Sequence, residues 1–361
     1  MTGEPGALGW RLVAGMERMT RDRIGDLALQ NAQRNQALID RGRSLAALRG
    51  AALGDGDHAV IVAAGPSVKR RDPVAQIRDS GYRGAVVATD SAIYTCLRNG
   101  VVPDLVVTLD PHATRIVRWF GDPKLDEEAL GRDDYYRRQD MDDAFADEMR
   151  TNREILSLLD RHGAQMRIAL STSASQAVVE RVIDSGMQVY WWNPMLDDPE
   201  MPDSVTRALI DLNGMPAVNA GGNVGAACWM MAHAVLGKTR VALTGMDFSY
   251  YDGTPYRSTQ YYYEAVDLVG EENLDQVFIR VHNPHLDAWF FTDPAYMWYR
   301  QVFLEMAADA DCGTYNCTEG GHSVRRTDPV HALGLVPRHR LTGATKGAIH
   351  GQGPVRQPRR P

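Results

Sequence analysis

The amino-acid sequence predicts an α/β protein: a Rossmann-like, doubly wound and mostly parallel sheet with helices on both faces. Short, unbroken apolar runs alternate with helical segments, which is typical of parallel strands that are buried on both sides. Several of these runs end in small or polar residues, as strands do at the ligand-binding edge of open α/β sheets. With 361 residues, 44% of them apolar, the chain can form one large domain or two medium ones.

The composition indicates a soluble, cytoplasmic protein. The net charge of −7 argues against a general nucleic-acid binder, although a helix N-terminus can still bind an anion locally. None of the four cysteines forms a C-x-x-C pair, so we expect them to be reduced and mostly buried. Cys312 and Cys317 could ligate a metal, but no matching pair lies elsewhere, and we predict no metal site. The sequence shows no signal peptide, and the longest apolar helix candidate, Ala226–Leu236, is too short to cross a bilayer.

Residues 1–54 are predicted to form an N-terminal helical segment. Apolar residues such as Ile24 and Leu27 recur at a spacing of three to four, with Arg, Asn and Gln between them. We interpret this segment as a polar helix that lies on the surface and carries no chemistry. The loop 54–57, Gly-Asp-Gly-Asp, separates it from the first strand.

The stretch Val60–Val68 combines a buried strand, a turn and the start of a helix. Gly65 and Pro66 end the apolar run, and Ser67 suits the N-cap of a helix over 68–79. Free backbone N–H groups and the helix dipole would point at one spot, so this turn predicts a phosphate site. The alternative is an ordinary strand-to-helix turn, because Gly-Pro-Ser is a short motif.

Two further predicted strands, 85–89 and 105–109, also end in polar residues. The residues at these two ends that we predict to bind a ligand are Thr89, Asp90, Ser91 and Asp110. Because the carboxyl ends of parallel strands lie along one edge, these residues should join the first turn in one site. Each aspartate alone could simply cap the following helix. For the pair we favour contact with a ribose, a base or a metal.

Residues 121–165 are predicted to form an acidic helical insertion or lid. Between 121 and 150 there are eleven Asp or Glu against five Lys or Arg. A helical face that is simply solvated is the alternative interpretation. Beyond it, apolar runs predict strands over 166–170 and 188–192, with a helix between them.

A second glycine-rich stretch, 219–227, opens an apolar helix that runs to Leu236. Small residues let a backbone or a ligand come close, and a helix that is apolar almost all round should be central. The next predicted strand, 240–244, provides a fourth polar strand end. The predicted binding residues from this part of the chain are Gly221, Gly222, Asn223, Gly245 and Asp247.

The region 250–287 is rich in tyrosine and contains two histidines in predicted loops, His282 and His285. Tyrosine-rich loops suit sugars and heterocycles, and histidine suits a general base that deprotonates an acceptor hydroxyl. The alternative is that both histidines are surface residues. We place one Rossmann-like domain over residues 55–325, and predict that the basic residues 326–361, with their Pro and Gly, are disordered.

Taken together, these stretches resemble the MptE-like family, which includes the motility accessory factor proteins tied to flagellin glycosylation. The motifs that carry the resemblance are Gly65-Pro66-Ser67, Thr89-Asp90-Ser91, Gly100–Asp104 leading to Asp110, Gly221–Val224 leading to Leu236-Gly237, Gly245-Met246-Asp247 and Asn316–Gly321. One branch of the family comprises archaeal pterin diphosphokinases that use ATP and magnesium. The other is tied to glycosylation of flagellin with nonulosonic acids.

The second branch is also similar to the single-domain bacterial sialyltransferases, whose pattern of a small-residue loop, a helix and a strand ending Gly-x-Asp-Phe matches residues 221–248. In those enzymes the turn and the loop bind a cytidine-monophosphate sugar donor without a metal, and a late histidine is the base. The resemblance implies that residues 65–67 bind the donor phosphate and that residues 221–223 line the nucleotide. It also implies that His285, or else His282, is the base.

We therefore predict a glycosyltransferase that moves a CMP-type activated sugar, such as a nonulosonic acid, to a hydroxyl acceptor with inversion and without a required cofactor. Its partners would be the nucleotide sugar and a glycan or protein acceptor such as flagellin, and a homo-oligomer is left open. One alternative is Mg/ATP-dependent diphosphate transfer to a hydroxymethylpterin, with Asp90, Asp110 and Asp247 on the metal. The single aspartate in Thr108–Pro111 weakens that alternative, because the diphosphokinase branch usually has an acidic cluster there. Another alternative is a non-catalytic nucleotide- or sugar-binding protein.

Overall fold

A ten-stranded sheet forms the centre of the computed structural model, which describes residues 5–132, 134, 147–284, 286–318, 320–321 and, for the backbone alone, 349–350. The strand order is β12-β8-β2-β3-β4-β5-β6-β7-β13, and β1 pairs with β6 outside this path. All of these pairs are parallel except β13 with β7. The Rossmann-like α/β fold predicted from the alternating apolar runs is confirmed.

The strands of the large sheet are short, and most of their residues are buried. They are β1 (Arg43–Ser44), β2 (His58–Val62), β3 (Ala85–Thr89), β4 (Leu105–Thr108), β5 (Arg167–Ser171), β6 (Gln188–Pro194), β7 (Ala217–Val218), β8 (Arg240–Thr244), β12 (Gly313–Asn316) and β13 (Ile349–His350). For the six strands that the sequence predicts, β2, β3, β4, β5, β6 and β8, the boundaries agree within one or two residues, because each run is mostly apolar. The short strands β1, β7, β12 and β13 were not predicted.

The order of the strands reverses at the centre of the sheet. From β2 the chain adds strands outward on one side as far as β7, and it then returns to place β8 on the other side of β2. In open α/β sheets such a reversal leaves a crevice at the carboxyl ends of the two neighbouring strands, where ligands bind. Here the crevice lies between the ends of β2 and β8.

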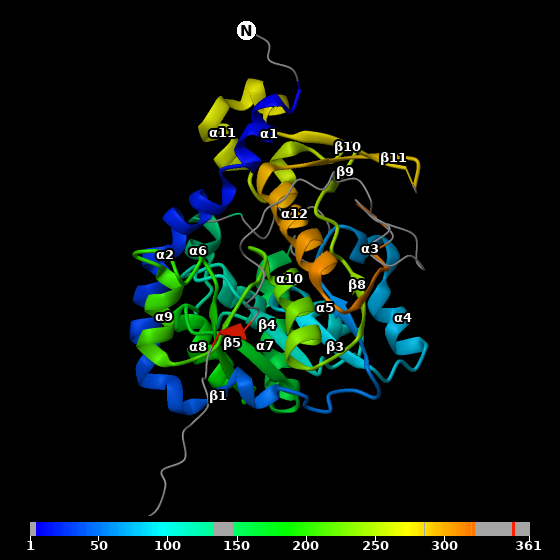
Figure 1. Cartoon of the computed structure of the whole chain (residues 1–361). Coiled ribbons are helices and arrows are strands. Elements are labelled where there is room, and N and C mark those ends of the chain that lie inside the picture. The colour runs from blue at the N-terminus through cyan, green and yellow to red at the C-terminus, as the bar shows by residue number, and fades with distance from the viewer. Residues whose placement is uncertain are drawn as a thin grey trace, which may run out of the picture.

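Helices cover both faces of this sheet (Figure 1). They are α1 (Ala7–Val13), α2 (Met16–Asn35), α3 (Ser67–Arg71), α4 (Pro73–Asp79), α5 (Ile93–Arg98), α6 (Glu127–Arg132), α7 (Glu148–His162), α8 (Gln176–Asp184), α9 (Val205–Asn213), α10 (Val224–Met230), α11 (Tyr262–Val269) and α12 (Pro294–Asp309). Along β2, Ile61 packs on the side of α10 and α12, whereas Val60 and Val62 pack on the side of α4 and α5. This alternation is what burial on two faces requires of a strand.

The predicted central helix is confirmed in position and burial. α10 continues as a π-helical turn, Met231–Val235, and Cys228, Trp229 and Met231 within this run have no exposed surface. The run contacts β2, β3 and β4, the middle of the sheet. A helix that is apolar all round is buried all round, because it has no polar stripe to face water.

The helix predicted over 68–79 is instead two short helices, α3 and α4. Asp72 lies between them in the left-handed region, with φ of 43°, and its side chain accepts a hydrogen bond from the backbone N–H of Ala75. Pro73 then takes the first position of α4, where its missing N–H group costs nothing. Asp72-Pro73 therefore ends one helix and starts the next.

A second, antiparallel sheet of three strands contains the region that the sequence predicts as tyrosine-rich loops. Its strands are β9 (Tyr250–Tyr251), β10 (Ile279–Asn283) and β11 (Ala288–Thr292), in the order β10-β11-β9. In Figure 1 it lies with α1 and α11 above the large sheet, and α12 runs between the two sheets. The loop prediction was wrong for residues 250–251 and 279–283, because tertiary packing pairs these residues as strands β9 and β10.

The N-terminal segment packs along both sheets. α1 contacts α12 and β10, and α2 contacts α8 and α9. On α2, Asn31 donates hydrogen bonds to the carbonyl oxygens of Pro111 (3.0 Å) and Ser173 (2.9 Å), and Asn35 donates to two more carbonyls nearby. Both asparagines are buried, so this helix fixes the loops at the carboxyl ends of β4 and β5.

Parts of two predicted regions lie outside the described residues. In the predicted acidic insertion, 121–165, the structure gives α6 and α7, but residues 133 and 135–146 are not among those it describes. In the predicted disordered tail, 326–361, only residues 349–350 are described, as β13. Within the described ranges, none of the helices combines the length and the apolar character that crossing a membrane requires.

Candidate functional site

A cavity of about 420 Å³ lies at the carboxyl ends of the central strands. Residues that follow β2 (63–66) and β8 (245–248) form two of its walls, so it occupies the crevice where the strand order reverses. Ten of the twelve residues predicted to bind a ligand line it: Gly65, Pro66, Thr89, Asp90, Ser91, Asp110, Gly222, Asn223, Gly245 and Asp247. Its size lies within the range of small-molecule sites.

The Gly-Pro-Ser turn is held against the end of β8 by hydrogen bonds. The N–H of Gly65 donates to the carbonyl oxygen of Gly245 (2.8 Å). The backbone N–H of Ser67 donates to both carboxylate oxygens of Asp247 (3.2 and 3.3 Å), and the Ser67 hydroxyl donates to one of them (2.8 Å). A carboxylate from the protein therefore lies where the sequence predicts the phosphate of a ligand.

This arrangement changes the roles predicted for the turn. Ser67 is buried in the first turn of α3, and the N-cap position belongs to Pro66, whose side chain makes no capping bond. Gly65 has no room for a side chain, because a Cβ there would lie 2.2 Å from Asp247 Oδ2 and 2.4 Å from the Gly245 carbonyl oxygen. The turn shapes the cavity wall, and its first amides are already bonded within the protein.

Asp90 is a buried carboxyl group in the wall of the cavity. Its Oδ2 accepts a hydrogen bond from the Thr108 hydroxyl (2.8 Å) and its Oδ1 from the backbone N–H of Ser91 (2.7 Å). Burial raises the pKa of Asp90 to about 7; these hydrogen bonds oppose the shift, and the nearby negative charge of Asp110 adds to it. Asp110 is exposed, and its Oδ1 accepts the N–H of His112 (2.7 Å).

The start of α10 supplies backbone donors to the cavity wall. Asn223 is the N-cap: its Oδ1 accepts the N–H of Ala226 (2.9 Å), and its amide donates to the Gly221 carbonyl (3.2 Å). The N–H groups of Val224 and Gly225 precede the first hydrogen bond within the helix, and both residues line the cavity. Gly221 lies behind this wall, outside the residues that line the cavity.

Four tyrosines form an aromatic wall that the sequence prediction covered only in part. They are Tyr250, Tyr261, Tyr296 and Tyr299. The rings of Tyr250 and Tyr296 stack with centroids 5.4 Å apart, and the hydroxyls of Tyr261 and Tyr299 are 3.0 Å apart. Burial raises the pKa of Tyr299 to about 12, so its hydroxyl stays protonated at neutral pH. The i, i+3 spacing of Tyr296 and Tyr299 on a predicted helix was the signal that could have identified them.

Asp293, at the N-cap of α12, lies next to this wall and was also missed. Its Oδ1 accepts the N–H of Tyr296 (2.8 Å), and its Oδ2 is buried with no hydrogen-bond partner among the described residues. Burial raises the pKa of Asp293 to about 7. The sequence showed only a helix cap here, because nothing local reveals that the cap is buried.

Charged residues at the mouth of the cavity come from α3 and α5. Lys69 and Arg98 line it together with Asp72. The Arg98 guanidinium carbon lies 5.0 Å from the ring centroid of Tyr94, whose hydroxyl donates to Glu154 (2.6 Å). The mouth therefore carries positive charge beside the carboxyl groups of the interior.

Of the two predicted bases, the structure describes His282 alone, and it places His282 outside the cavity. His282 lies on the solvent face of β10, where its Nε2 is 3.3 Å from Asp287 Oδ1, and it is not among the residues that line the cavity. His285 lies outside the described residues. The lining residues that the structure describes include no histidine.

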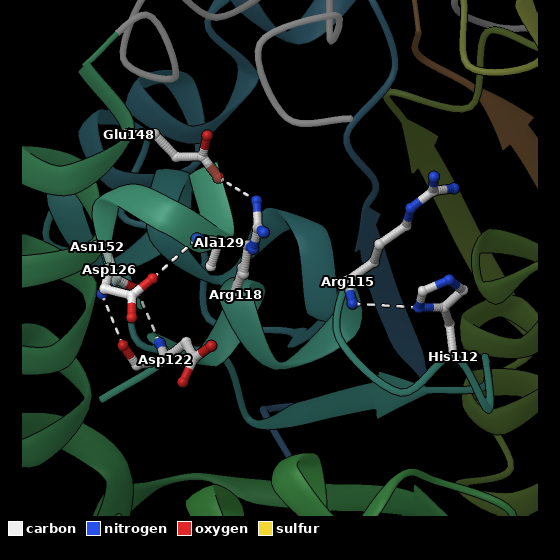
Figure 2. Close-up of polar contacts among 8 residues, drawn as sticks. All are labelled: His112, Arg115, Arg118, Asp122, Asp126, Ala129, Glu148 and Asn152. Atoms are coloured by element: carbon white, nitrogen blue, oxygen red, sulfur yellow. Dashed lines mark hydrogen bonds and ion pairs between the residues drawn. The ribbon is translucent and has the colours of Figure 1, made fainter. Parts of the chain in front are cut away.

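The segment after β4 closes one side of the site and is tied to α7 (Figure 2). Within it, Ile116 and Trp119 line the cavity, and between them Arg118 forms an ion pair with Glu148 at 2.5 Å. Both charged side chains are about 95% buried. Asn152 adds two hydrogen bonds to the backbone of this segment at Asp122 (2.7 and 2.8 Å). The position of this wall thus depends on α7.

The aspartates of the cavity do not gather into a metal site. Among the described residues, no group of three or more His, Cys, Asp or Glu side chains could hold a metal ion. Asp247 is bonded to Ser67, and Asp90 is bonded to Thr108 and Ser91, whereas Asp72 and Asp110 are exposed. All four cysteines are free thiols, and three of them are buried.

Comparisons with known proteins agree with the resemblance described above. A family model described as "6-hydroxymethylpterin diphosphokinase MptE-like" matches residues 29–121, which contain β2, β3, β4 and their polar ends. Among solved structures, a MAf glycosyltransferase from Magnetospirillum magneticum AMB-1 has a similar fold, with a TM-score of 0.50 and 14% sequence identity. The match covers 85% of this chain but only 40% of that protein. No curated protein matches the chain. The family match and the shared fold confirm the resemblance to the MptE-like and motility accessory factor proteins.

Proposed function

We propose that this protein is a glycosyltransferase that transfers a sugar from a nucleotide donor of the CMP type to a hydroxyl group of a glycan or protein. The observation that carries the proposal is the position of the cavity. It lies at the reversal between β2 and β8 and contains ten residues chosen from the sequence as ligand contacts. The fold shared with a MAf glycosyltransferase is consistent with this function.

The donor phosphate is assigned to the start of α10 rather than to the Gly-Pro-Ser turn. Val224 and Gly225 offer N–H groups in the cavity wall, whereas the Ser67 N–H is already bonded to Asp247. Backbone donors at the start of a helix bind phosphate and stabilise the negative charge that develops on a departing phosphate. Lys69 and Arg98 at the mouth add positive charge.

The aromatic wall suits the flat parts of such a donor. Tyr250, Tyr261, Tyr296 and Tyr299 offer ring faces for a base or a sugar, and hydroxyls for hydrogen bonds. Together with the polar strand ends, they give the cavity both aromatic and polar surface. A nucleotide sugar likewise combines a flat aromatic base with polar phosphate and hydroxyl groups.

Asp90 takes the role of general base in this proposal. It lines the cavity, each of its oxygens accepts only one protein hydrogen bond, and a pKa of about 7 is near the optimum for proton transfer at neutral pH. The acceptor oxygen would form a bond to the anomeric carbon while the bond from that carbon to the phosphate oxygen breaks. The acceptor proton would pass to Asp90, and the bonding electrons would leave with CMP.

Diphosphate transfer from ATP is the second candidate, favoured by the description of the family model. It would need magnesium, which usually takes one or two carboxylates together with substrate phosphates. Asp110 could supply one such carboxylate, but Asp90 and Asp247 are bonded within the protein. The described residues therefore fit this reaction less well than they fit sugar transfer.

Thermal-shift measurements with CMP, UDP, GDP and ATP, each with and without magnesium, separate the candidates. Sugar transfer predicts stabilisation by CMP that does not depend on magnesium, whereas a strict need for ATP with magnesium would refute it. With the donor identified, Asp90→Asn should keep CMP affinity within about threefold and lower transfer by at least about 100-fold. Unchanged transfer would remove Asp90 as the base, and CMP binding without any transfer would indicate a non-catalytic binding protein.

A further inference from the structure

The hairpin of β10 and β11 presents one large aromatic side chain to solvent. In β10 the residues alternate, so that Arg280 and His282 face solvent while their neighbours are buried. Trp289 of β11 pairs directly with His282 across the strands and is 50% exposed. Figure 1 shows that this hairpin extends from the rest of the molecule. The exposed indole is thus on the most projecting strand pair.

The indole is held in a defined orientation. The ring of His282 lies 5.0 Å from that of Trp289 between centroids, and the guanidinium carbon of Arg280 lies 5.1 Å from the Trp289 centroid. Each of these neighbours pairs with a carboxylate: Arg280 with Asp252 and His282 with Asp287, both at 3.3 Å. We call these five residues the Trp289 platform. Because its members fix one another, little side-chain freedom remains to be lost when a ligand binds.

The chemistry of the platform matches a carbohydrate. One face of a pyranose ring is a row of C–H groups that packs on a flat indole, and its hydroxyls accept from and donate to Arg, His and Asp side chains. Arg280 faces Asp252, and His282 lies within hydrogen-bond distance of Asp287, so the surface offers several hydrogen-bonding groups beside the indole. The exposed apolar side chains in the hairpin are Trp289 and the 38% exposed Leu286. A stable protein interface typically needs about 800 Å² from each partner, far more than one indole provides.

The platform is continuous with the wall of the cavity. Two residues after Trp289, Phe291 stacks on Tyr250 with centroids 5.4 Å apart, and Tyr250 lines the cavity. The strand rise separates Trp289 from Phe291 by about 7 Å. The same small sheet therefore carries the platform at its outer end and an aromatic residue of the cavity at its inner end.

We propose that the Trp289 platform is a carbohydrate-binding subsite, separate from the nucleotide cavity, on which a sugar ring of a glycan chain stacks against the indole. The subsite binds glycan whether or not the cavity is occupied. It holds the glycan chain on the small sheet, which leads into the cavity.

Saturation-transfer NMR on the full chain with maltohexaose, cellohexaose and chitohexaose as probes tests this proposal. We expect at least one oligosaccharide to give transfer from the protein, with affinity lowered at least tenfold in Trp289→Ala and partly retained in Trp289→Phe. Trp10→Ala is the matched control, because Trp10 is 51% exposed on α1, outside the hairpin. CMP-induced thermal shifts should be the same in all variants and also show that they are folded.

Absence of saturation transfer from the protein to any of the three oligosaccharides would overturn the proposal. Equal oligosaccharide affinity in wild type and Trp289→Ala would also overturn it. Light scattering adds an independent outcome: a dimer of the wild type that dissociates in Trp289→Ala would assign the surface to a second copy of the chain instead. Loss of CMP binding in every variant, with glycan binding intact, would count against the proposed transferase alone.

Discussion

Asp247 determines what the Gly65-Pro66-Ser67 turn can do. Its carboxylate accepts the Ser67 N–H and hydroxyl, so it satisfies donors that an incoming phosphate would otherwise use. The same carboxylate lies so close to Gly65 that no side chain fits between them. At this residue the glycine is needed for close packing of two loops, and we propose that the phosphate binds at the start of α10 instead.

Gly65→Ala is therefore expected to lower the free energy of unfolding by about 1–3 kcal/mol or more, because the new methyl group would overlap a carboxylate and a carbonyl group. Urea unfolding of the purified chain measures this. Gly131→Ala on α6 is the control, since a Cβ there meets nothing within 4 Å and alanine favours a helix. Equal stability of Gly65→Ala and wild type would show that the turn relaxes and that the packing explanation is wrong.

Asp293 predicts a dependence of stability on pH. Its pKa is about 7 in the folded protein against 3.8 for the ordinary group, so between these values the folded state holds a proton that the unfolded state has lost. Its contribution is complete below pH 4 and disappears as the pH rises through 7, with a slope of up to about 1.4 kcal/mol per unit.

Asp293→Asn removes this titration and keeps the cap, since asparagine also caps helices well. The stability of the variant relative to wild type should increase between pH 5 and pH 8 in chemical denaturation. Asp309→Asn, at the exposed end of the same helix, should show no such gain. A gain for Asp293→Asn that is the same at both pH values would contradict a buried, titrating carboxyl group.

At the scale of elements, α2 acts as a clamp on the sheet. Asn31 and Asn35, one turn apart, donate four hydrogen bonds to the loops after β4 and β5, and Asp110 of the cavity lies beside one of these loops. Asn31→Ala and Asn35→Ala should each cost about 1–3 kcal/mol of unfolding free energy, because buried carbonyl groups lose their partners. Gln33→Ala, exposed on the same helix, should change it by less than about 0.5 kcal/mol. Equal effects of all three would mean that the clamp does not hold the loops.

Some of the strands and helices could be predicted from the sequence pattern alone. Strands such as β3 and β8 could be predicted because their runs are apolar throughout, and α10 because it is apolar on all sides. The small sheet was not predicted, although β10 alternates apolar and polar residues, because the polar and turn-forming residues around its short strands are typical of loops. With β10 as a strand, His282 points to solvent and away from the predicted role.

At the scale of the whole molecule, the site depends on one long-range pairing. Ser67 and Asp247 are 180 residues apart in sequence and meet because β8 lies beside β2. The polar ends of the strands could be listed from the sequence, since each follows its own strand. Which strand ends lie next to one another could not be predicted from the sequence, because strand order is set by packing of the complete sheet. For this reason ten of the predicted residues line one cavity. The bonding of the Gly65-Pro66-Ser67 turn to Asp247 and the positions of Asp293 and Tyr299 were not predicted.

We propose that a CMP-type nucleotide binds in the cavity between β2 and β8. Calorimetric titration of CMP without magnesium tests it most directly, with two variants that add the same side chain. Ala64→Trp fills the cavity from an exposed position in its wall, and Ala47→Trp adds an indole to the exposed side of another segment. We expect wild type and Ala47→Trp to bind CMP with equal affinity and Ala64→Trp to bind it at least tenfold more weakly. Failure of the wild type to bind CMP, or equal binding by Ala64→Trp, would contradict it.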